Sequence, residues 1–136
     1  MTRVIADTSA LYALVDRTDP HHGQAANFLK SQASNRSLLV SNHVFDETMT
    51  VVKTRLGMRV ALQLGLRLRN SRFVQIVVFS SAQERETWRI FSQYTDKDWS
   101  YTDCACLVLA QEHELHQAFT FDHHFAQMGL VMVPSS

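Results

Sequence analysis

Residues 3–15 read RVIADTSALYALV, and the expected architecture can be built outward from this segment. Residues 3–6 are short, apolar and rich in β-branched side chains, which is typical of a strand buried in a sheet. The strand ends abruptly at Asp7, and Thr8 or Ser9 is placed to cap the helix that the rest of the stretch predicts. We therefore expect a buried strand that passes directly through an acidic residue into a helix.

Strands and helices alternate along the remaining chain. Apolar runs predict strands at residues 3–6, 37–41, 73–79, 118–121 and 130–133. Helices are expected to end near residues 15, 31, 56, 70, 94, 115 and 128, and their expected N-caps after the first helix include Asp19, Asn42 and Ser81, the last paired with Glu84 in a capping box. Such alternation implies parallel strands with helices on both faces. We predict an α/β fold, a three-layer α/β/α sandwich around a central, mainly parallel sheet.

The composition excludes several classes of protein. With 136 residues, the chain has the length of one domain, and we expect residues 1–136 to form a single one. Hydrophobic residues make up 46% and charged residues 19%, as in an ordinary soluble globular protein. The 13 basic side chains balance the 13 acidic ones, so any binding of nucleic acid must come from a local patch rather than from bulk charge.

The cysteines and the N-terminus indicate the compartment. Cys104 and Cys106 are two residues apart on a predicted helix, so they point to different faces and cannot pair with each other. We expect them to be small core residues rather than nucleophiles. The apolar N-terminal stretch contains Asp7 and Asp16, and it is too short and too acidic for a signal peptide or a membrane span. A cytoplasmic protein without membrane contact is expected.

Four carboxylates occupy comparable places in this pattern. Asp7 follows the first strand, and Asp122 follows the strand at 118–121. Asp103 lies in the first turn of its predicted helix, on the apolar face. Either aspartate after a strand, taken alone, is more simply a helix N-cap. Because function gathers at the carboxyl ends of parallel strands, we nevertheless expect these acids to meet at one edge of the sheet.

The fourth carboxylate, Glu47, is expected on the buried face of its helix. Val44 and Val51 lie three residues before it and four residues after it, so the spacing directs all three side chains toward the sheet. The neighbouring Asp46 is expected to face water. A lone buried carboxylate is costly, so Glu47 needs a partner, and no arginine is obviously placed to provide one.

Four acids at one edge of a small sheet predict a metal site. Like charges about 4 Å apart repel by about 4 kcal/mol per pair at an effective dielectric of about 20. Raised pKa values or a hard divalent cation would relieve this repulsion. Oxygen ligands suit Mg²⁺ or Mn²⁺ rather than zinc, and such an ion is well matched to phosphate. Metal-assisted hydrolysis of a phosphodiester is the reaction class that follows.

Four segments together resemble the PIN domain family, and within it the VapC-type toxin ribonucleases of prokaryotic toxin–antitoxin pairs. The segments are VIADTS at 4–9, HVFDET at 43–48, SYTDC at 100–104 and TFDHHF at 120–125. Their order and spacing are similar to the family pattern over nearly the whole chain. The resemblance implies a PIN-like fold over residues 1–136 and a cytoplasmic endoribonuclease that uses Mg²⁺ or Mn²⁺ to hydrolyse RNA phosphodiester bonds.

The same resemblance implies roles for particular residues. The implied metal-binding and catalytic residues are Asp7, Glu47, Asp103 and Asp122, and the implied polar residues lining the site are Thr8, Ser9, Thr102 and Thr120. Some family members carry a further acid where this chain has His123 and His124, so the number of metal ions stays open. Either Glu47 or Asp122 could accept the proton of the attacking water. The implied partners are an RNA substrate, a cognate antitoxin that enters the groove and a second copy of the chain.

A run of basic residues offers a surface for RNA. Between Thr48 and Gln83 there are six lysines and arginines and no acid. A solvated helix face is the commoner meaning of such a run. One-sided charge in an otherwise neutral chain favours instead an arm that follows phosphates. We expect Lys53, Arg55 and Arg59 to contribute most, because they continue the helix that carries Glu47.

Other functions fit the sequence less well. A receiver-like domain needs an aspartate at the end of its third strand and a lysine after its last β–α turn, whereas residues 73–79 hold no acid and no lysine follows Lys97. An aspartyl phosphatase needs a second aspartate where Ser9 stands. The seven histidines and two cysteines form no tetrahedral zinc set at sensible spacing. The alternatives that stay open are a PIN-like nuclease of RNA processing and a weakly active metal- or partner-binding module.

Overall fold

A central sheet of five parallel strands organises the protein. The computed structural model describes residues 2–32 and 35–135. The strands are β1 (Thr2–Ala6), β2 (Arg36–Ser41), β3 (Val74–Val77), β4 (Gln117–Phe119) and β5 (Val131–Val133). They are ordered β3-β2-β1-β4-β5, and each neighbouring pair is parallel. The predicted parallel α/β architecture is therefore confirmed.

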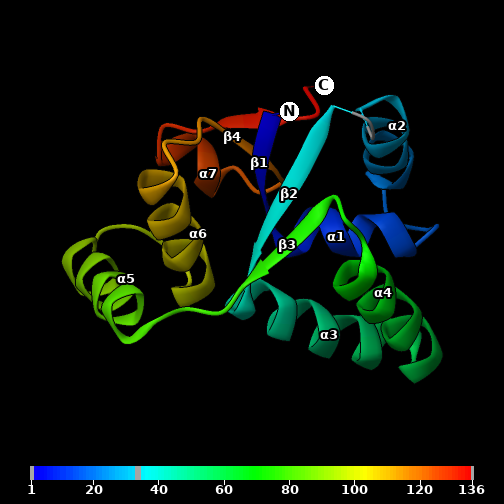
Figure 1. Cartoon of the computed structure of the whole chain (residues 1–136), viewed down its shortest axis with the longest axis horizontal. Helices are drawn as coiled ribbons and strands as arrows, with labels where there is room; N and C mark the ends of the chain where they lie inside the picture. Colours follow the sequence, from blue (N-terminus) through cyan, green and yellow to red (C-terminus); the bar gives the residue numbers. More distant parts are fainter. Residues whose placement is uncertain (1, 33–34, 136) are drawn as a thin grey trace.

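Helices cover both faces of this sheet (Figure 1). One side carries α1 (Thr8–Val15), α2 (His22–Gln32), α3 (Asn42–Leu56) and α4 (Met58–Asn70), and the other carries α5 (Ser81–Gln93), α6 (Tyr101–Glu112) and α7 (His124–Gln127). The chain builds β2 and β3 outward from β1 and then crosses to β4 on the opposite side of β1. Right-handed crossovers in opposite directions place their helices on opposite faces, which produces the three predicted layers.

The strand order reverses beside β1, and this reversal determines where a site can form. Ligands of open α/β sheets bind at the carboxyl ends of the strands, where the order reverses. Ile5 of β1 pairs with Ala118 of β4, and Ala6 pairs with Phe119. The residues that follow the two strands, beginning with Asp7 and Thr120, therefore lie side by side.

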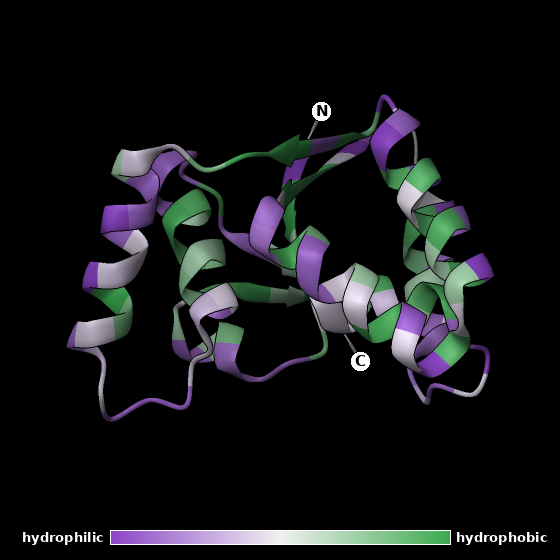
Figure 2. Cartoon of the chain, turned by 90° about the horizontal axis from the view of Figure 1, so that it is seen from below, coloured by the Kyte–Doolittle hydropathy of each residue, from purple (hydrophilic) through white to green (hydrophobic). Residues whose placement is uncertain are grey.

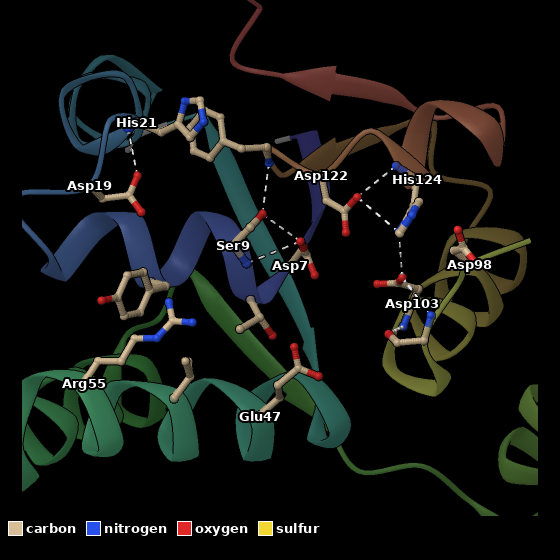
Figure 3. Close-up of a pocket in the computed structure, with 15 residues that line it drawn as sticks. Asp7, Ser9, Asp19, His21, Glu47, Arg55, Asp98, Asp103, Asp122 and His124 are labelled. Atoms are coloured by element: carbon tan, nitrogen blue, oxygen red, sulfur yellow. Dashed lines mark hydrogen bonds and ion pairs between the residues drawn. The ribbon is translucent and has the colours of Figure 1, made fainter.

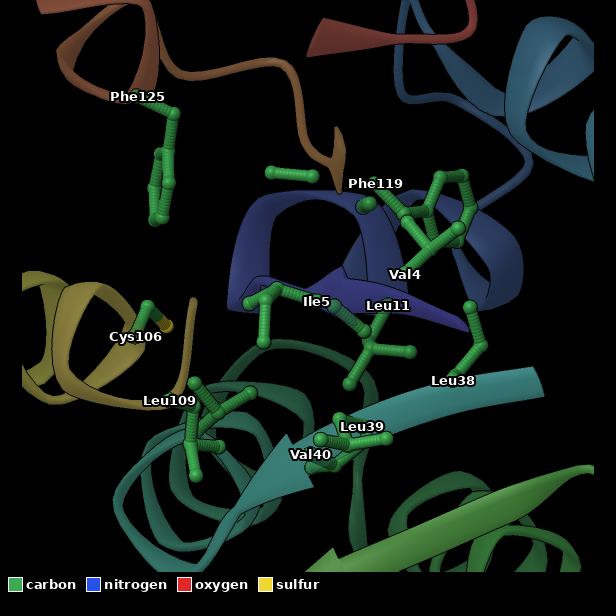
Figure 4. Packing of buried hydrophobic residues seen from close by; sticks show 14 of the residues in the cluster. Val4, Ile5, Leu11, Leu38, Leu39, Val40, Cys106, Leu109, Phe119 and Phe125 are labelled. Carbon is green, nitrogen blue, oxygen red and sulfur yellow. The ribbon is translucent and has the colours of Figure 1, made fainter. Parts of the chain in front are cut away.

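The hydrophobic core fills the space between the sheet and both helix layers (Figure 4). Val4 and Ile5 of β1 and Leu39 and Val40 of β2 are almost completely buried although they alternate between the two faces. Figure 2 shows hydrophobic residues along much of the strands and mainly hydrophilic residues in the loop between α5 and α6. Strands covered on both faces form continuous apolar runs, which is why the sequence locates them.

Three helix caps lie one or two residues before their expected positions, whereas α2 begins at His22, three residues after the predicted cap Asp19. The observed caps are Asp7 for α1, Ser41 for α3 and, in a capping box with Gln83, Ser80 for α5, where the sequence predicts Thr8 or Ser9, Asn42, and Ser81 with Glu84. In each case the last extended residue before the helix accepts the hydrogen bond, and the expected cap is already helical. Asn42 has a different role, since its Oδ1 accepts the Phe79 N–H at 2.9 Å.

Helix α6 ends three residues earlier than predicted. Glu114 has a φ of 52°, in the left-handed region, and Leu115 N–H donates to the Ala110 carbonyl at 2.8 Å. This is a Schellman ending, which stops the helix although the apolar pattern continues. Cys104 and Cys106 of α6 are buried and free, and burial raises the pKa of the Cys104 thiol to about 11. Their predicted role as core residues is confirmed.

Truncation of a central-strand residue tests the importance of this core. Leu39 is completely buried in β2, so Leu39→Ala should lower the free energy of unfolding by about 2–5 kcal/mol. The exposed Leu62 on α4 provides the control, because Leu62→Ala should change it by less than about 0.5 kcal/mol. Urea denaturation followed by circular dichroism measures both. Equal effects of the two substitutions would contradict the assignment of the core.

Candidate active site

A pocket of about 560 Å³ lies at the carboxyl ends of β1 and β4 (Figure 3). Six carboxylates line it, those of Asp7, Asp19, Glu47, Asp98, Asp103 and Asp122. Among the described residues that line this pocket, Arg55 is the only lysine or arginine. All four acids singled out in the sequence thus surround one strongly negative cavity.

Asp7 forms the buried floor of the pocket. Its side chain is held through Oδ2, which accepts hydrogen bonds from Ser9 Oγ at 2.8 Å and from Thr120 Oγ1 at 2.9 Å. Its backbone N–H donates to the Phe119 carbonyl at 3.0 Å, which fixes it against β4. Burial raises the pKa of Asp7 to about 6, and the nearby Asp103 adds to this rise, while the two hydroxyls oppose it.

Asp103 is positioned by the first turn of α6. Its Oδ2 accepts the Ser100 N–H at 3.0 Å, and its own N–H donates to Ser100 Oγ at 3.0 Å. This capping box turns the carboxylate toward the sheet, where it is buried. Burial raises the pKa of Asp103, and Asp122 contributes to the rise, while the Ser100 N–H and His124 lower it.

Asp122 and His124 close the pocket from the turn after β4. Thr120 Oγ1 accepts the Asp122 N–H at 3.0 Å, and Asp122 Oδ1 accepts the His124 N–H at 3.0 Å. His124 Nδ1 lies 3.2 Å from Asp122 Oδ1 and 3.3 Å from Asp103 Oδ2, so the imidazole bridges the two acids. His123 is exposed, whereas the turn capped by Asp122 directs the ring of His124 inward.

The potential metal-ligand atoms of the pocket differ in how close they lie to one another. Within the described part of the chain, the only group of three acid, histidine or cysteine ligand atoms lying within 4.8 Å of one another is that of Asp122, His123 and His124. The four predicted acids instead surround an open cavity, with room between them for an ion.

Glu47 lines the pocket but is not buried, so the expected burial of this residue is wrong. The buried residues of α3 are Val44, Thr48 and Val52, a stripe that passes beside Glu47 rather than through it. The side chain therefore stands at the rim, exposed to water, and reaches toward Asp7 (Figure 3). Water thus solvates the carboxylate, so it needs no buried partner. The expectation that Asp46 faces water is confirmed.

The predicted polar residues lie at different depths. Thr8 and Ser9 line the pocket, and Thr48 Oγ1 donates to Thr8 Oγ1 at 3.4 Å. Thr120 is completely buried and contacts the pocket only through Asp7 and its neighbours. The structure does not bring Thr102 into the pocket, since it lines a neighbouring hollow that also contains Glu47.

The three predicted basic residues face different parts of the surface. Arg55 lines the pocket, two turns after Glu47 on α3. Lys53 points to the other side of α3, into a hollow shared with α4, and Arg59 is exposed on α4. Their different directions follow from the helical period, which rotates Lys53 away from the face that carries residues 47, 51 and 55.

Four residues of the pocket have no clear signal in the sequence. Asp98 is an exposed loop residue before α6, and Asp19, His21 and Phe121 belong to turns. Asp19 resembles an ordinary helix cap and does accept the His21 N–H at 2.8 Å. The sequence does not indicate that the turn holding Asp19 and His21 lies at the pocket, so it gives no reason to assign these two residues to the site.

Comparison with known proteins identifies the family. The family model described as "PIN domain" matches residues 4–130 of this sequence. The chain belongs to the PIN domain family. This confirms the resemblance that the four sequence segments carry. PIN-domain nucleases generally depend on divalent metal ions.

Two curated relatives from Mycobacterium tuberculosis (strain ATCC 25618 / H37Rv) match nearly the whole chain. The 23S rRNA-specific endonuclease VapC20 is 27% identical over 130 residues, which cover 96% of this chain and 97% of the relative. Ribonuclease VapC26 is 29% identical over 126 residues, which cover 92% of this chain and 91% of the relative. Both relatives are named as nucleases, which agrees with the reaction class that the sequence predicts.

Solved structures share the fold. The crystal structure of Mycobacterium tuberculosis VapC20, described as a sarcin-ricin loop cleaving toxin, has a TM-score of 0.87 at 26% identity and covers 94% of this chain and 96% of that one. VapBC2 from Rickettsia felis, bound to a promoter DNA fragment, has a TM-score of 0.70 at 16% identity. The match covers 96% of this chain and 97% of that one. The second likeness concerns the fold alone.

The pocket of this PIN domain has the chemistry that a divalent ion requires. Its donors are carboxylate and hydroxyl oxygens, which suit hard cations. Asp7 is 3% exposed, and its hydrogen-bond donors are neutral hydroxyls and a backbone amide. A buried carboxylate compensated so weakly favours protonation or an added positive charge, as its raised pKa of about 6 shows.

The raised pKa of Asp7 predicts a pH-dependent loss of stability without metal. Between about pH 4 and pH 6 the folded protein keeps a proton that the unfolded chain, with a pKa near 3.8, has released. The wild-type protein should therefore lose stability relative to Asp7→Asn as the pH rises through this window, by up to about 3 kcal/mol. Urea denaturation in EDTA at several pH values measures the difference.

The exposed Asp96 supplies the control for this experiment. Its side chain is 77% exposed, so Asp96→Asn measures the effect of removing a carboxylate that water already solvates. A stability difference between wild type and Asp7→Asn that does not change from pH 4 to pH 7 would contradict the account of Asp7.

Proposed function

We propose that this chain is a Mg²⁺- or Mn²⁺-dependent endoribonuclease, the toxin of a VapC-type toxin–antitoxin pair, acting in the cytoplasm as one PIN-like domain. The observation that carries the proposal is the single pocket into which four separate segments bring acids, two of them buried with raised pKa values. Relatives named as an endonuclease and a ribonuclease support the reaction class. Among the described residues, none of the helices is both long and apolar enough to span a bilayer.

The proposed ligands of the ion are Asp7, Glu47, Asp103 and Asp122. A bound divalent ion would neutralise the phosphate oxygens of the scissile bond and make a water molecule more acidic. Ser9 and Thr120 occupy Oδ2 of Asp7 and thereby fix the orientation of that carboxylate. His124 does the same for Asp103 of α6 and Asp122 of the turn after β4, because its Nδ1 lies within 3.3 Å of a carboxylate oxygen of each.

The remaining steps fall to groups with access to water. Glu47 and Asp122 are less buried than Asp7, so either can accept the proton of the attacking water. Attack by water leaves the ribose 2′-hydroxyl unused, so the products carry 5′-phosphate and 3′-hydroxyl ends. Arg55 is the cation placed to meet a phosphate, while Lys53 and Arg59 lie along α3 and α4 for more distant phosphates.

The RNA target we propose is structured ribosomal RNA. VapC20 is named as specific for 23S rRNA, and its similarity extends along almost the whole of both chains. A PIN-like nuclease of RNA processing is the alternative. The genes beside this one distinguish the two, because a toxin is accompanied by a short reading frame for a DNA-binding antitoxin.

An antitoxin and a second copy of the chain are the proposed protein partners. Two exposed apolar surfaces support this proposal. One lies on α4, where Met58, Leu62 and Leu66 are more than half exposed, and the other on α5, where Trp88 is 61% exposed beside Phe91. Solved complexes of similar fold pair such chains with antitoxins in the Rickettsia felis and Salmonella typhimurium VapBC structures.

Replacement of Asp7 tests the activity directly. Asp7→Asn keeps the shape and one acceptor for Ser9 and Thr120 but removes the charge, so RNA cleavage should fall by more than about 100-fold in a folded protein. Primer extension on total RNA after induced expression measures cleavage and locates the cut, and purified RNA treated in vitro reveals the end groups. Asp96→Asn is the matched control. An Asp7→Asn protein that is as active as the wild type would overturn the assignment.

Metal binding should stabilise the protein through the same acids. With about 10 mM Mg²⁺ and a Kd of about 1 mM, linkage predicts a gain of about 1.4 kcal/mol, or about 5 °C in Tm. Asp7→Asn and Asp103→Asn should lose this shift, whereas Asp46→Asn, outside the pocket, should keep it. Differential scanning calorimetry with Mg²⁺, Mn²⁺ and EDTA tests this. An equal shift in all three variants would place the ion elsewhere.

A further inference from the structure

The side of the pocket opposite Asp103 and Asp122 has a different chemistry. Tyr12, His21, Arg55 and Phe121 line it, and we refer to these four residues as the aromatic–arginine wall (Figure 3). None of the four is among the proposed ligands of the ion. The pocket therefore has an acidic half and a second half that the metal chemistry does not explain.

The upper part of the wall is a pair of stacked rings. The His21 and Phe121 rings are parallel, with centroids 4.3 Å apart and an interplanar angle of 6°. Both side chains are half-buried and both line the pocket. The stack therefore presents a flat aromatic surface beside the acids.

This stack is held in a defined position. Asp19 Oδ1 accepts the backbone N–H of His21 at 2.8 Å, and His22 Nδ1 lies 2.7 Å from the Ala13 carbonyl, which ties the turn to α1. Phe121 N–H donates to Ser9 Oγ at 3.0 Å, and the same hydroxyl donates to Asp7 Oδ2. One serine thus connects the stack to the floor of the acidic half.

The lower part of the wall is a cation over an aromatic ring. Arg55 Cζ lies 5.3 Å from the centroid of the Tyr12 ring, and Tyr12 Oη donates to Asp16 Oδ2. Glu47, Val51 and Arg55 are spaced by four residues on α3, and all three line the pocket. The helix therefore brings a proposed metal ligand and a cation to the same cavity.

A flat aromatic stack next to a guanidinium matches the two ends of a nucleotide. Single-stranded RNA is recognised by stacking unpaired bases on His, Phe, Tyr or Trp rings, and arginine binds phosphate through its fork of donors. A base within a duplex cannot reach such a surface because it is already stacked and paired. The wall thus favours a nucleotide that has left its helix.

We propose that the aromatic–arginine wall binds one unstacked nucleotide of the RNA next to the scissile phosphate. The base lies on the His21–Phe121 stack, and Arg55 binds the phosphate of that nucleotide. This inference rests on the proposed function and adds a requirement to it, namely that the cut is made at an unpaired residue. Selection of loops over duplexes then comes from the wall rather than from the metal.

Binding to RNA in the absence of cleavage tests the wall. Wild-type protein is titrated into a fluorescein-labelled 12-nucleotide RNA of mixed sequence, either single-stranded or annealed to its complement, and anisotropy gives Kd. Ca²⁺ replaces Mg²⁺ so that a hard cation is present at the acids while cleavage is suppressed, and a gel checks that the RNA stays intact. Under these conditions His21→Ala and Arg55→Met should each weaken binding of the single strand by about 10-fold. His21→Phe preserves an aromatic face and should stay within about 2-fold. The single strand should bind more tightly than the duplex.

Matched controls come from residues outside the pocket. His116 and Arg85 are exposed and do not line it, so His116→Ala and Arg85→Met should leave Kd unchanged. A spectroscopic signature distinguishes stacking from a purely structural effect. RNA strands carrying 2-aminopurine, one position at a time, should show fluorescence quenching at one position by the His21 protein and by His21→Phe, and not by His21→Ala.

The outcomes separate the wall from the proposed function. Wild-type protein that cleaves RNA, together with His21→Ala and Arg55→Met proteins that bind the single strand as tightly as their parent, would overturn the wall and leave the nuclease in place. Wild-type protein that neither cleaves nor binds RNA would overturn both. Variants that lose affinity for a cognate antitoxin while keeping affinity for RNA would make the wall a protein-docking surface and would likewise overturn its nucleotide role.

Discussion

The burial of one carboxylate at the end of the central strand is the constraint on which the site depends. Asp7 is 3% exposed, and its side chain is held by hydroxyls and a backbone amide rather than by a lysine or arginine. Its pKa of about 6 expresses the free-energy cost of holding that charge away from water. The end of the strand that precedes it, with Val4, Ile5 and Ala6 buried in the core, supplies the stability that offsets this cost. The result is a carboxylate in a fixed position that would gain more from a nearby cation than a solvated carboxylate would.

The sheet topology explains why the other acids surround the same point. The strand order reverses beside β1, because β2 and β3 follow on one side of it and β4 and β5 on the other. Segments from both helix layers and from the neighbouring strands therefore meet at the carboxyl end of β1. α3 brings Glu47 from one helix layer, α6 brings Asp103 from the other, and the turn after β4 brings Asp122 from the adjacent strand. Each segment is anchored by its own local device, such as the Ser100 capping box at Asp103. The convergence is therefore a property of the fold, while the separation of the acids around the cavity is set by the individual turns.

The sequence predicts those features that depend on local patterns and misses those that depend on the placement of turns. The strands could be located because both of their faces are buried, and Asp7 and Asp103 could be identified because each stands at an element boundary. The burial of Glu47 was mispredicted because the apolar stripe of α3 runs through Val44, Thr48 and Val52, and a buried threonine is invisible to hydrophobic periodicity. Nothing in the sequence indicates that His21 stacks on Phe121, since residues so distant in the chain meet only through the register of β1 and β4. The inward turn of His124 likewise depends on the hydrogen bond that Asp122 accepts from the first residue of a four-residue helix.

Charge balance links the two halves of the pocket. Six carboxylates against Arg55 make the metal-free cavity a poor host for a phosphate, because the repulsion of several acids exceeds the attraction of one guanidinium. A divalent ion at the acids removes part of this repulsion, so affinity for the ion and affinity for RNA must rise together, each by the same factor. Ser9 adds a mechanical link, since its hydroxyl contacts both Asp7 and the backbone of Phe121. The same hydroxyl therefore fixes the position of the proposed base-stacking surface relative to the carboxylate of Asp7.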